Sequence, residues 1–116
     1  DLIAERTQPD EDENTLFMQQ FINAAEDLLP QGQCSQERIA ERMHVSVSTL
    51  RRRVIDATGE SPQSYIMIIR MQKAASFLRE QRPLKEVASL CGFSDASSLS
   101  HAFKRFYGFP PSQFKT

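Results

Sequence analysis

Four polar residues near the middle of the chain have the types and spacing needed to contact the edges of nucleic-acid bases. Ser48 and Thr49 are small, and Arg51 and Arg52 follow them by about one helical turn. Small side chains at the start of a helix let its backbone approach the bases, and arginine is the commonest donor to O6 and N7 of guanine. With Arg53 beside them, these residues predict a helix that reads a major groove. The simpler interpretation of such an arginine triplet is a solvated helix face.

A second polar stripe begins 49 residues after Ser48 and carries less charge at its start. Its candidate donors to bases or phosphates are Ser97, Ser100 and His101, and the cations Lys104 and Arg105 follow. Lysine and arginine donate to phosphate oxygens, which fix the position of a protein on a duplex without reading its sequence. We therefore expect this stripe to position the protein more than to specify a sequence.

The other reactive side chains form no catalytic or metal-binding pattern. The two histidines are His44 and His101, and the sequence shows neither a nucleophile, base and acid at catalytic spacing nor a glycine-rich phosphate loop. Cys34 and Cys91 lack the spacing of a zinc site or redox pair, so we interpret them as small apolar core residues. We expect neither an enzyme nor a metal or small-molecule cofactor.

Acidic and basic residues are segregated along the chain, although the formal net charge is only −1. Residues 1–14 hold six acids and one base, a balance of −5, which leaves +4 in residues 15–116. This predicts an acidic flexible linker over residues 1–14 attached to a mildly basic domain, a solvated linker being favoured over a DNA mimic. The weak overall charge leaves open a helical protein-interaction module that does not bind DNA.

The polar stripes require helices to hold them, and apolar residues recur at helical spacing from Asn14 onward. A first helix is predicted from Asn14 or Thr15 to Pro30, a short second helix after Ser35, and a third that Ser46 caps and Gly59 ends. The residues expected to face the core are Phe17, Phe21, Ala24, Ala25, Leu28, Ile39, Ala40, Met43, Leu50, Val54 and Ala57.

The second half predicts one long and two further helices. Ser61 and Pro62 begin a helix that runs to about Gln81, a short helix begins at Pro83, and a helix capped by Ser94 or Asp95 ends at Gly108. Their expected inward residues are Tyr65, Ile66, Ile69, Ala74, Phe77, Leu78, Val87, Ala88, Cys91, Leu99, Phe103 and Phe106. Because no alternating pattern indicates a strand, the predicted fold class is all-α, with about seven helices.

The two halves repeat each other. Ile39-Ala40 matches Val87-Ala88 and Ser46 matches Ser94 at an offset of 48, whereas Leu50, Gly59 and Pro62 match Leu99, Gly108 and Pro111 at an offset of 49. Each copy is a short helix, a tight turn and a longer helix, which is a helix-turn-helix. The turn favours a left-handed residue, which Gly92 supplies easily and which His44 must supply in the first copy.

The long helix between the copies is a spacer of about 30 Å, close to the 34–36 Å that separates successive major grooves on one side of B-DNA. One chain could then read an asymmetric site. We predict helix-turn-helix subdomains at residues 15–60 and 83–116, joined by a linker helix at residues 61–82.

The chain resembles the DNA-binding domain of the AraC/XylS family of bacterial transcription regulators. The resemblance rests on the segments EVASLCGFSD at residues 86–95, FKRFYG at residues 103–108 and Pro110-Pro111, with support from GESP at residues 59–62, Tyr65, Arg70 and Ala74. It covers about residues 17–115.

This resemblance implies two helix-turn-helix units that bind double-stranded DNA through the major groove, with contact to RNA polymerase in activation of transcription. By position it assigns base reading to Ser48 and Arg52 and to Ser97 and His101, with Thr49 and Arg51 as neighbours.

Two places depart from the family pattern, and one matching residue lies away from the predicted base-reading faces. Leu99 stands where an aromatic residue is common, and Phe114-Lys115 where an aromatic-arginine pair is usual. Arg70 matches the family but lies in the linker helix, so we assign it a structural role, paired with an acid such as Glu86 or Asp95.

No apolar stretch approaches the roughly 20 residues that span a bilayer, and no secretory leader is visible, so we expect a cytoplasmic protein without membrane contact. The chain begins at Asp1 without an initiator methionine and resembles a piece of a longer protein. We expect an N-terminal sensor or receiver domain to precede it.

Overall fold

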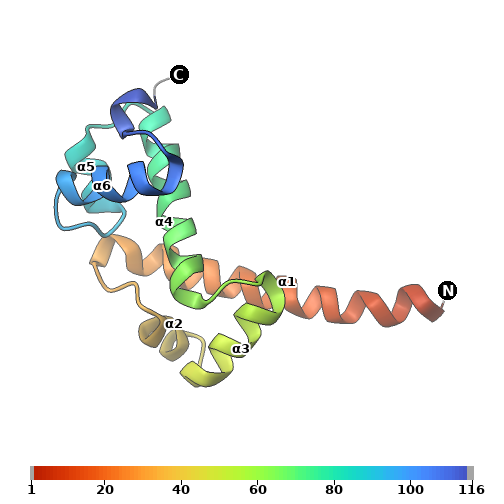
Figure 1. The fold of residues 1–116 in the computed structure, drawn as a ribbon. Helices are drawn as coiled ribbons and strands as arrows, with labels where there is room; N and C mark the ends of the chain where they lie inside the picture. The colour runs from red at the N-terminus through yellow and green to blue at the C-terminus, as the bar shows by residue number, and fades with distance from the viewer. Residues whose placement is uncertain (1, 115–116) are drawn as a thin grey trace.

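The computed structural model describes the backbone of residues 2–114 and the side chains of residues 13–114. In this range the chain forms six α-helices, two short 3-10 helices and no strand, which confirms the all-α prediction (Figure 1). The elements are α1 (Leu2–Leu28), η1 (Leu29–Gln31), α2 (Gln36–Arg42), α3 (Val47–Thr58), α4 (Pro62–Arg79), α5 (Leu84–Leu90), α6 (Ala96–Tyr107) and η2 (Pro111–Gln113). Lys115, one of the residues that depart from the family pattern, lies outside the described residues.

Hydrogen-bonding side chains set where most of the helices begin. The hydroxyls of Ser35, Ser46 and Ser61 accept from the backbone N–H three residues later, at the first turns of α2, α3 and α4. Asp95, one of the two predicted caps, does the same for α6. Each bond satisfies an N–H that the helix cannot pair internally, so the predicted starts of these helices are confirmed.

Helix α1 begins much earlier than the sequence predicts. It starts at Leu2 and not at Asn14, and the expectation of a flexible linker over residues 1–14 is therefore wrong for residues 2–14. This segment has no glycine and contains good helix formers such as Leu2, Ala4 and Glu5, but it also contains Pro9, which removes one backbone hydrogen bond from the helix. Once the apolar half of α1 is anchored in the core, extending the helix needs no new nucleation. In Figure 1 the red N-terminal part of α1 projects away from the other helices.

Two hydrophobic cores share helix α4. The first is built from α1, α2 and α3, and α4 contributes Ile66 and Ile69 to it. The second is built from α5 and α6, and α4 contributes Met71, Ala74 and Ala75 to it. A single helix thus forms a wall of both cores and connects them without a flexible segment, as Figure 1 shows.

Phe106 is the predicted core residue that the structure places outside. Its side chain is 43% exposed, whereas Leu99 and Phe103 of the same helix are fully buried. In the last turn of α6 the inward place belongs to Tyr107, whose ring packs 4.7 Å from that of Phe103 and whose hydroxyl donates to the Met71 carbonyl. Phe109 and Phe114 pack against the ring of Phe103, and Phe106 lies at the edge of the cluster with its ring 4.9 Å from that of Tyr107.

Candidate nucleic-acid interface

Helix α3 buries one side and presents a polar stripe on the other. Leu50 and Val54 are fully buried in the first core, whereas Ser48, Arg51 and Arg52 are exposed. These three residues share one face because they lie three and four residues apart. The structure therefore brings together the predicted base-reading residues of the first unit on an accessible surface.

Two residues beside this stripe have structural contacts of their own. Thr49 is half-buried, its N–H donates to the Ser46 hydroxyl, and the Ser46 hydroxyl donates to that of Thr49 at 3.0 Å. The Arg53 guanidinium lies 4.2 Å from the ring centroid of Phe17 on α1, a cation–π contact. Arg53 thus fastens α3 to α1, and Arg51 and Arg52 are the members of the triplet that point outward.

Helix α6 repeats the arrangement with a different chemistry. Ser97, His101, Lys104 and Arg105 are exposed and Ser100 is half-buried. The start of α6 carries a fixed negative charge, because the carboxylate of the N-cap residue Asp95 accepts from the Ser98 N–H at 2.7 Å. This bond holds the pKa of Asp95 below its usual value. An anionic cap opposes a DNA phosphate, whereas the neutral Ser46 cap of α3 does not.

The cations of the two stripes are not engaged in ion pairs. The ion pairs among the described residues involve other bases, which are Arg38, Arg42, Lys73 and Arg82. Arg51, Arg52, Lys104 and Arg105 therefore keep their charge available for an external anion.

The turns of the two units have the predicted left-handed residue. His44 has φ 60° and Gly92 has φ 80°, 48 residues apart. The caps Ser46 and Asp95 are 49 residues apart, so the extra residue of the second unit lies between Gly92 and Asp95. Gly92 has a second constraint, since a Cβ there would lie 3.0 Å from the Leu29 carbonyl oxygen.

Arg70 is structural, but the predicted acidic partners are wrong. Its Nε donates to the Cys91 carbonyl and an Nη to the Gly92 carbonyl, both at 2.9 Å, and its guanidinium stacks 3.9 Å from the centroid of the Phe93 ring. These backbone oxygens are freed where the turn interrupts α5, and a forked donor suits the pair. Sequence patterns cannot show such partners, because a backbone carbonyl has no residue signature.

The predicted acids have other roles. Glu86 accepts from Arg82 at 2.6 Å, and Asp95 caps α6.

The prediction that the two cysteines are small apolar core residues agrees better with the structure. Cys91 is buried, Cys34 is half-buried, both are free thiols, and burial raises the pKa of each to about 11.

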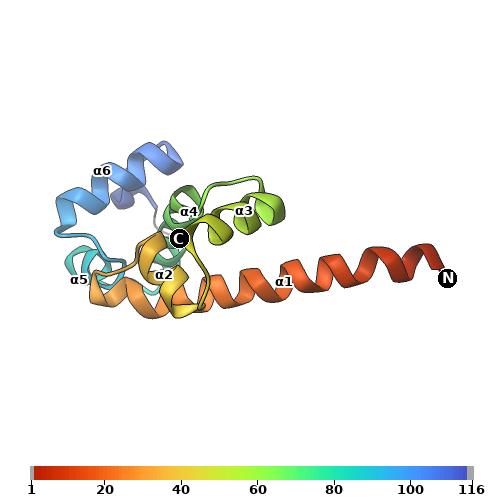
Figure 2. The ribbon, with the colours of Figure 1, turned by 90° about the horizontal axis from the view of Figure 1, so that it is seen from below.

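Helices α3 and α6 lie on a common side of the molecule. Figure 2 shows α3 and α6 on the side opposite α1, and Figure 1 shows them at opposite ends of α4. Helix α4 has 18 residues, which corresponds to about 27 Å. The predicted extent to Gln81 was two residues too long, because the helix ends at Arg79 and Gln81 takes a left-handed φ of 63°.

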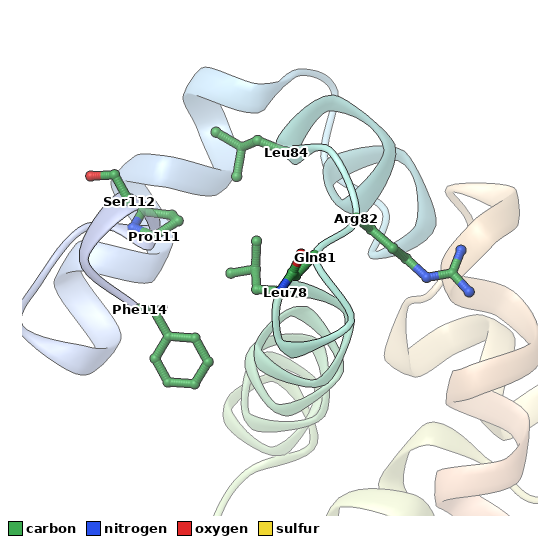
Figure 3. A pocket seen from close by; sticks show the side chains of 7 residues that line it. All are labelled: Leu78, Gln81, Arg82, Leu84, Pro111, Ser112 and Phe114. Carbon is green, nitrogen blue, oxygen red and sulfur yellow. The ribbon is translucent and has the colours of Figure 1, made fainter. Parts of the chain in front are cut away.

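A cleft of about 560 Å³ lies away from both stripes, at the end of α4 (Figure 3). Its lining residues are Leu78, Gln81, Arg82, Leu84, Pro111, Ser112 and Phe114. Figure 3 shows the Arg82 side chain directed away from the rest, consistent with its bonds to Glu80 and Glu86. Because the cleft includes none of the predicted site residues, it is separate from the candidate interface.

None of the helices in the described part of the chain is both long and apolar enough to cross a membrane.

Comparisons with known proteins relate this geometry to a family. A model described as "Helix-turn-helix domain" matches residues 39–116. The regulator RipA of Corynebacterium glutamicum is 40% identical over 87 residues, which are 75% of this chain and 26% of RipA. The regulator VirS of Mycobacterium tuberculosis is 34% identical over 98 residues, 84% of this chain and 28% of VirS. The chain thus spans less than a third of the length of these relatives.

Solved structures agree with these sequence matches. The C-terminal domain of AraT, a response regulator from Geobacillus stearothermophilus, superposes with a TM-score of 0.75 at 28% identity, over 84% of this chain and 82% of that domain. The DNA-binding domain of AdpA, solved in complex with a target DNA, gives a TM-score of 0.70 at 28% identity, over 81% of this chain and 85% of that domain. With its paired helix-turn-helix units and shared α4, the chain belongs to the AraC-type family of helix-turn-helix DNA-binding domains found in transcription regulators.

Proposed function

We propose that this domain binds a single asymmetric duplex site by placing α3 and α6 in successive major grooves. The observation that carries the proposal is that α3 and α6, each with an exposed polar stripe, lie at the two ends of α4 and on the same side of α1 (Figures 1 and 2). The length of α4, about 27 Å, is of the scale of the 34–36 Å between such grooves. The AdpA domain, which has the same fold, was solved on its target DNA.

In this proposal α3 specifies the sequence. Arg51 and Arg52 donate to guanine O6 and N7, and Ser48 sits at the helix start where the backbone comes closest to the bases. Thr49, held by its bond to Ser46, contributes through the same first turn. The neutral cap leaves the helix N-terminus suitable for a phosphate.

Helix α6 mainly positions the domain. Lys104 and Arg105, near its C-terminal end, contact the phosphate backbone, and Ser97, Ser100 and His101 make the contacts nearer the bases. The charge of Asp95 keeps phosphates away from the start of α6 and so favours the neutral base edges there.

The domain acts as part of a larger regulator in the bacterial cytoplasm. Its relatives are longer than this chain, since the matched segments make up only 26% of RipA and 30% of RhaS from Escherichia fergusonii, which is named a transcriptional activator. We propose a sensor or receiver domain in the remaining part and activation through contact with RNA polymerase.

Selection from a random DNA library by the purified domain tests the proposal. We expect an enriched asymmetric site with two conserved segments about one helical turn apart. Binding to that site should weaken with salt, with a log–log slope of about −0.9 for each phosphate contact. The proposal would be contradicted if the selection enriched no sequence and the affinity for DNA did not change with salt concentration. That result would favour the alternative of a helical protein-interaction module.

A further inference from the structure

Ile55 is an exposed apolar side chain on the reading surface of α3. It is 41% exposed and follows Arg52 by three residues and Arg51 by four, so it continues their stripe by one turn. The half-buried residues that pack around the first core include Val45, Val47 and Ala57, and Ile55 is not among them. Ile55 therefore lies outside the first core, and 41% of its surface faces solvent.

The internal repeat shows which residue takes the place of Ile55 in the second unit. At the offset of 49 that relates α3 to α6, Ile55 corresponds to Lys104. A lysine at this position is well hydrated and suited to a phosphate. An isoleucine gives up that contact and places apolar surface in water on a stripe whose other residues, Ser48, Arg51 and Arg52, are polar.

The major groove offers one apolar group, the 5-methyl group of thymine. Seven residues separate Ser48 from Ile55, about 10 Å along the helix, which is comparable to the groove width of about 12 Å. One helical turn beyond the arginines corresponds to one or two base pairs. Because isoleucine is β-branched, its χ1 is nearly fixed in a helix and its methyl groups are held in one place.

We infer that Ile55 contacts the 5-methyl group of a thymine and specifies that base, one or two base pairs beyond those read by Arg51 and Arg52. This inference rests on the proposed placement of α3 in a major groove. The exposed stripe of α3 would then read bases in two ways, through hydrogen bonds from Arg51 and Arg52 to guanine and through an apolar contact of Ile55 with thymine.

Replacement of single thymines by deoxyuridine tests the contact, because uracil lacks only the 5-methyl group. In the site selected by the wild-type domain, each thymine of the segment read by α3 is replaced in turn and the Kd is measured. Loss of one buried methyl group corresponds to about a fourfold increase in Kd. We expect this loss at one thymine for the wild type and its absence for Ile55→Ala. The matched control is Leu16→Ala, which removes an even more exposed side chain, 61%, from α1 and should keep the full uracil effect.

Ile55→Lys provides a second variant with an opposite effect. It copies the residue of the second unit, so it should tighten binding to all sequences, steepen the salt slope by about 0.9 and abolish the uracil effect. Ile55 is exposed, so both variants should retain the wild-type Tm.

Equal binding of wild type to thymine and uracil at every position would overturn the assignment of Ile55. If Arg52→Ala still relaxed a base preference in that case, base reading by α3 would stand and only the methyl contact would fall. If Arg52→Ala also left every preference unchanged, the proposed role of α3 would fall with it.

Discussion

Removal of the Arg70 side chain should weaken the second helix-turn-helix unit more than any other single truncation of a cation in α4. Its two hydrogen bonds to the carbonyls of Cys91 and Gly92 come from a charged donor, and such bonds contribute about 1.5–3 kcal/mol each. The stacking on Phe93 adds about 0.5–1 kcal/mol. Because water reaches part of the half-buried Arg70, the lower ends of these ranges apply. We expect Arg70→Ala to lower the free energy of unfolding by about 3 kcal/mol.

The assay is thermal and urea unfolding followed by helical circular dichroism. A loss of about 3 kcal/mol corresponds to a decrease in Tm of roughly 10–15 °C for a domain of this size. Arg79→Ala is the matched control, since Arg79 is an exposed arginine on the same helix whose contact is a cation–π distance of 5.3 Å to Phe114. Arg70→Lys keeps the charge but cannot bridge two carbonyls with a planar fork, so its Tm should fall between the wild type and Arg70→Ala.

An Arg70→Ala variant as stable as Arg79→Ala would refute this reasoning. It would show that packing of the turn, and not the two carbonyl bonds, fixes the second unit against α4. The wild-type and variant domains should also differ on DNA: the variant should lose affinity for the complete site while keeping affinity for the segment that α3 reads.

The remaining predictions concern the interface, a helix cap and the thiols. Arg52→Ala should weaken binding to the selected site by about 1–3 kcal/mol and relax one base preference, measured as Kd on a panel of single-base variants; an unchanged preference would contradict base reading by this residue. Lys104→Ala should weaken binding to all DNA sequences equally and make the log–log slope of affinity against salt shallower by about 0.9; an affinity loss that depends on the DNA sequence would instead assign Lys104 to base reading. Ser46→Ala should cost about 1 kcal/mol of stability by urea unfolding, through loss of the cap of α3, and an unchanged midpoint would show that the cap is dispensable. Cys34 and Cys91, with pKa values of about 11, should resist alkylation at pH 7 until the domain unfolds, and stability should fall as the pH rises from about 9 to 11, because unfolded thiols ionise first; rapid labelling of the native domain would show that they are reactive.

The sequence alone predicted the features that local chemistry determines. Ser35, Ser46 and Ser61 cap helices where the pattern placed caps, since a short polar side chain before an apolar run has few other uses. The left-handed backbone at His44 followed from its equivalence to Gly92 in the repeat. The exposed stripes also followed, because burying Leu50 and Leu99 fixes which residues face outward.

Features that depend on tertiary contacts were not predictable in this way. The inward pattern of α6 suits Phe106 as well as Tyr107, and only the positions of Phe109 and Phe114 decide between them. The partners of Arg70 are backbone oxygens, which no residue type marks. The start of α1 was placed at Asn14, a good cap, although the residues before it also favour a helix.

The sequence predicted which residues of α3 and α6 lie on their exposed faces, but not the contacts that surround them. Arg53 contacts Phe17 on another helix and is therefore not free to face outward. The anionic cap of α6 depends on a bond that Asp95 makes within the first turn of the folded helix. The assignment of individual bases to Ser48, Arg52, Ser97 and His101 remains a prediction.

Methylation interference on the selected site measures the placement of the two reading helices most directly, because methyl groups at guanine N7 block contacts in the major groove. If α3 and α6 occupy successive grooves on one side of the duplex, interfering positions should fall in two clusters centred about 10 base pairs apart. A single cluster, or two clusters separated by about half a turn and so facing opposite sides of the duplex, would contradict the account.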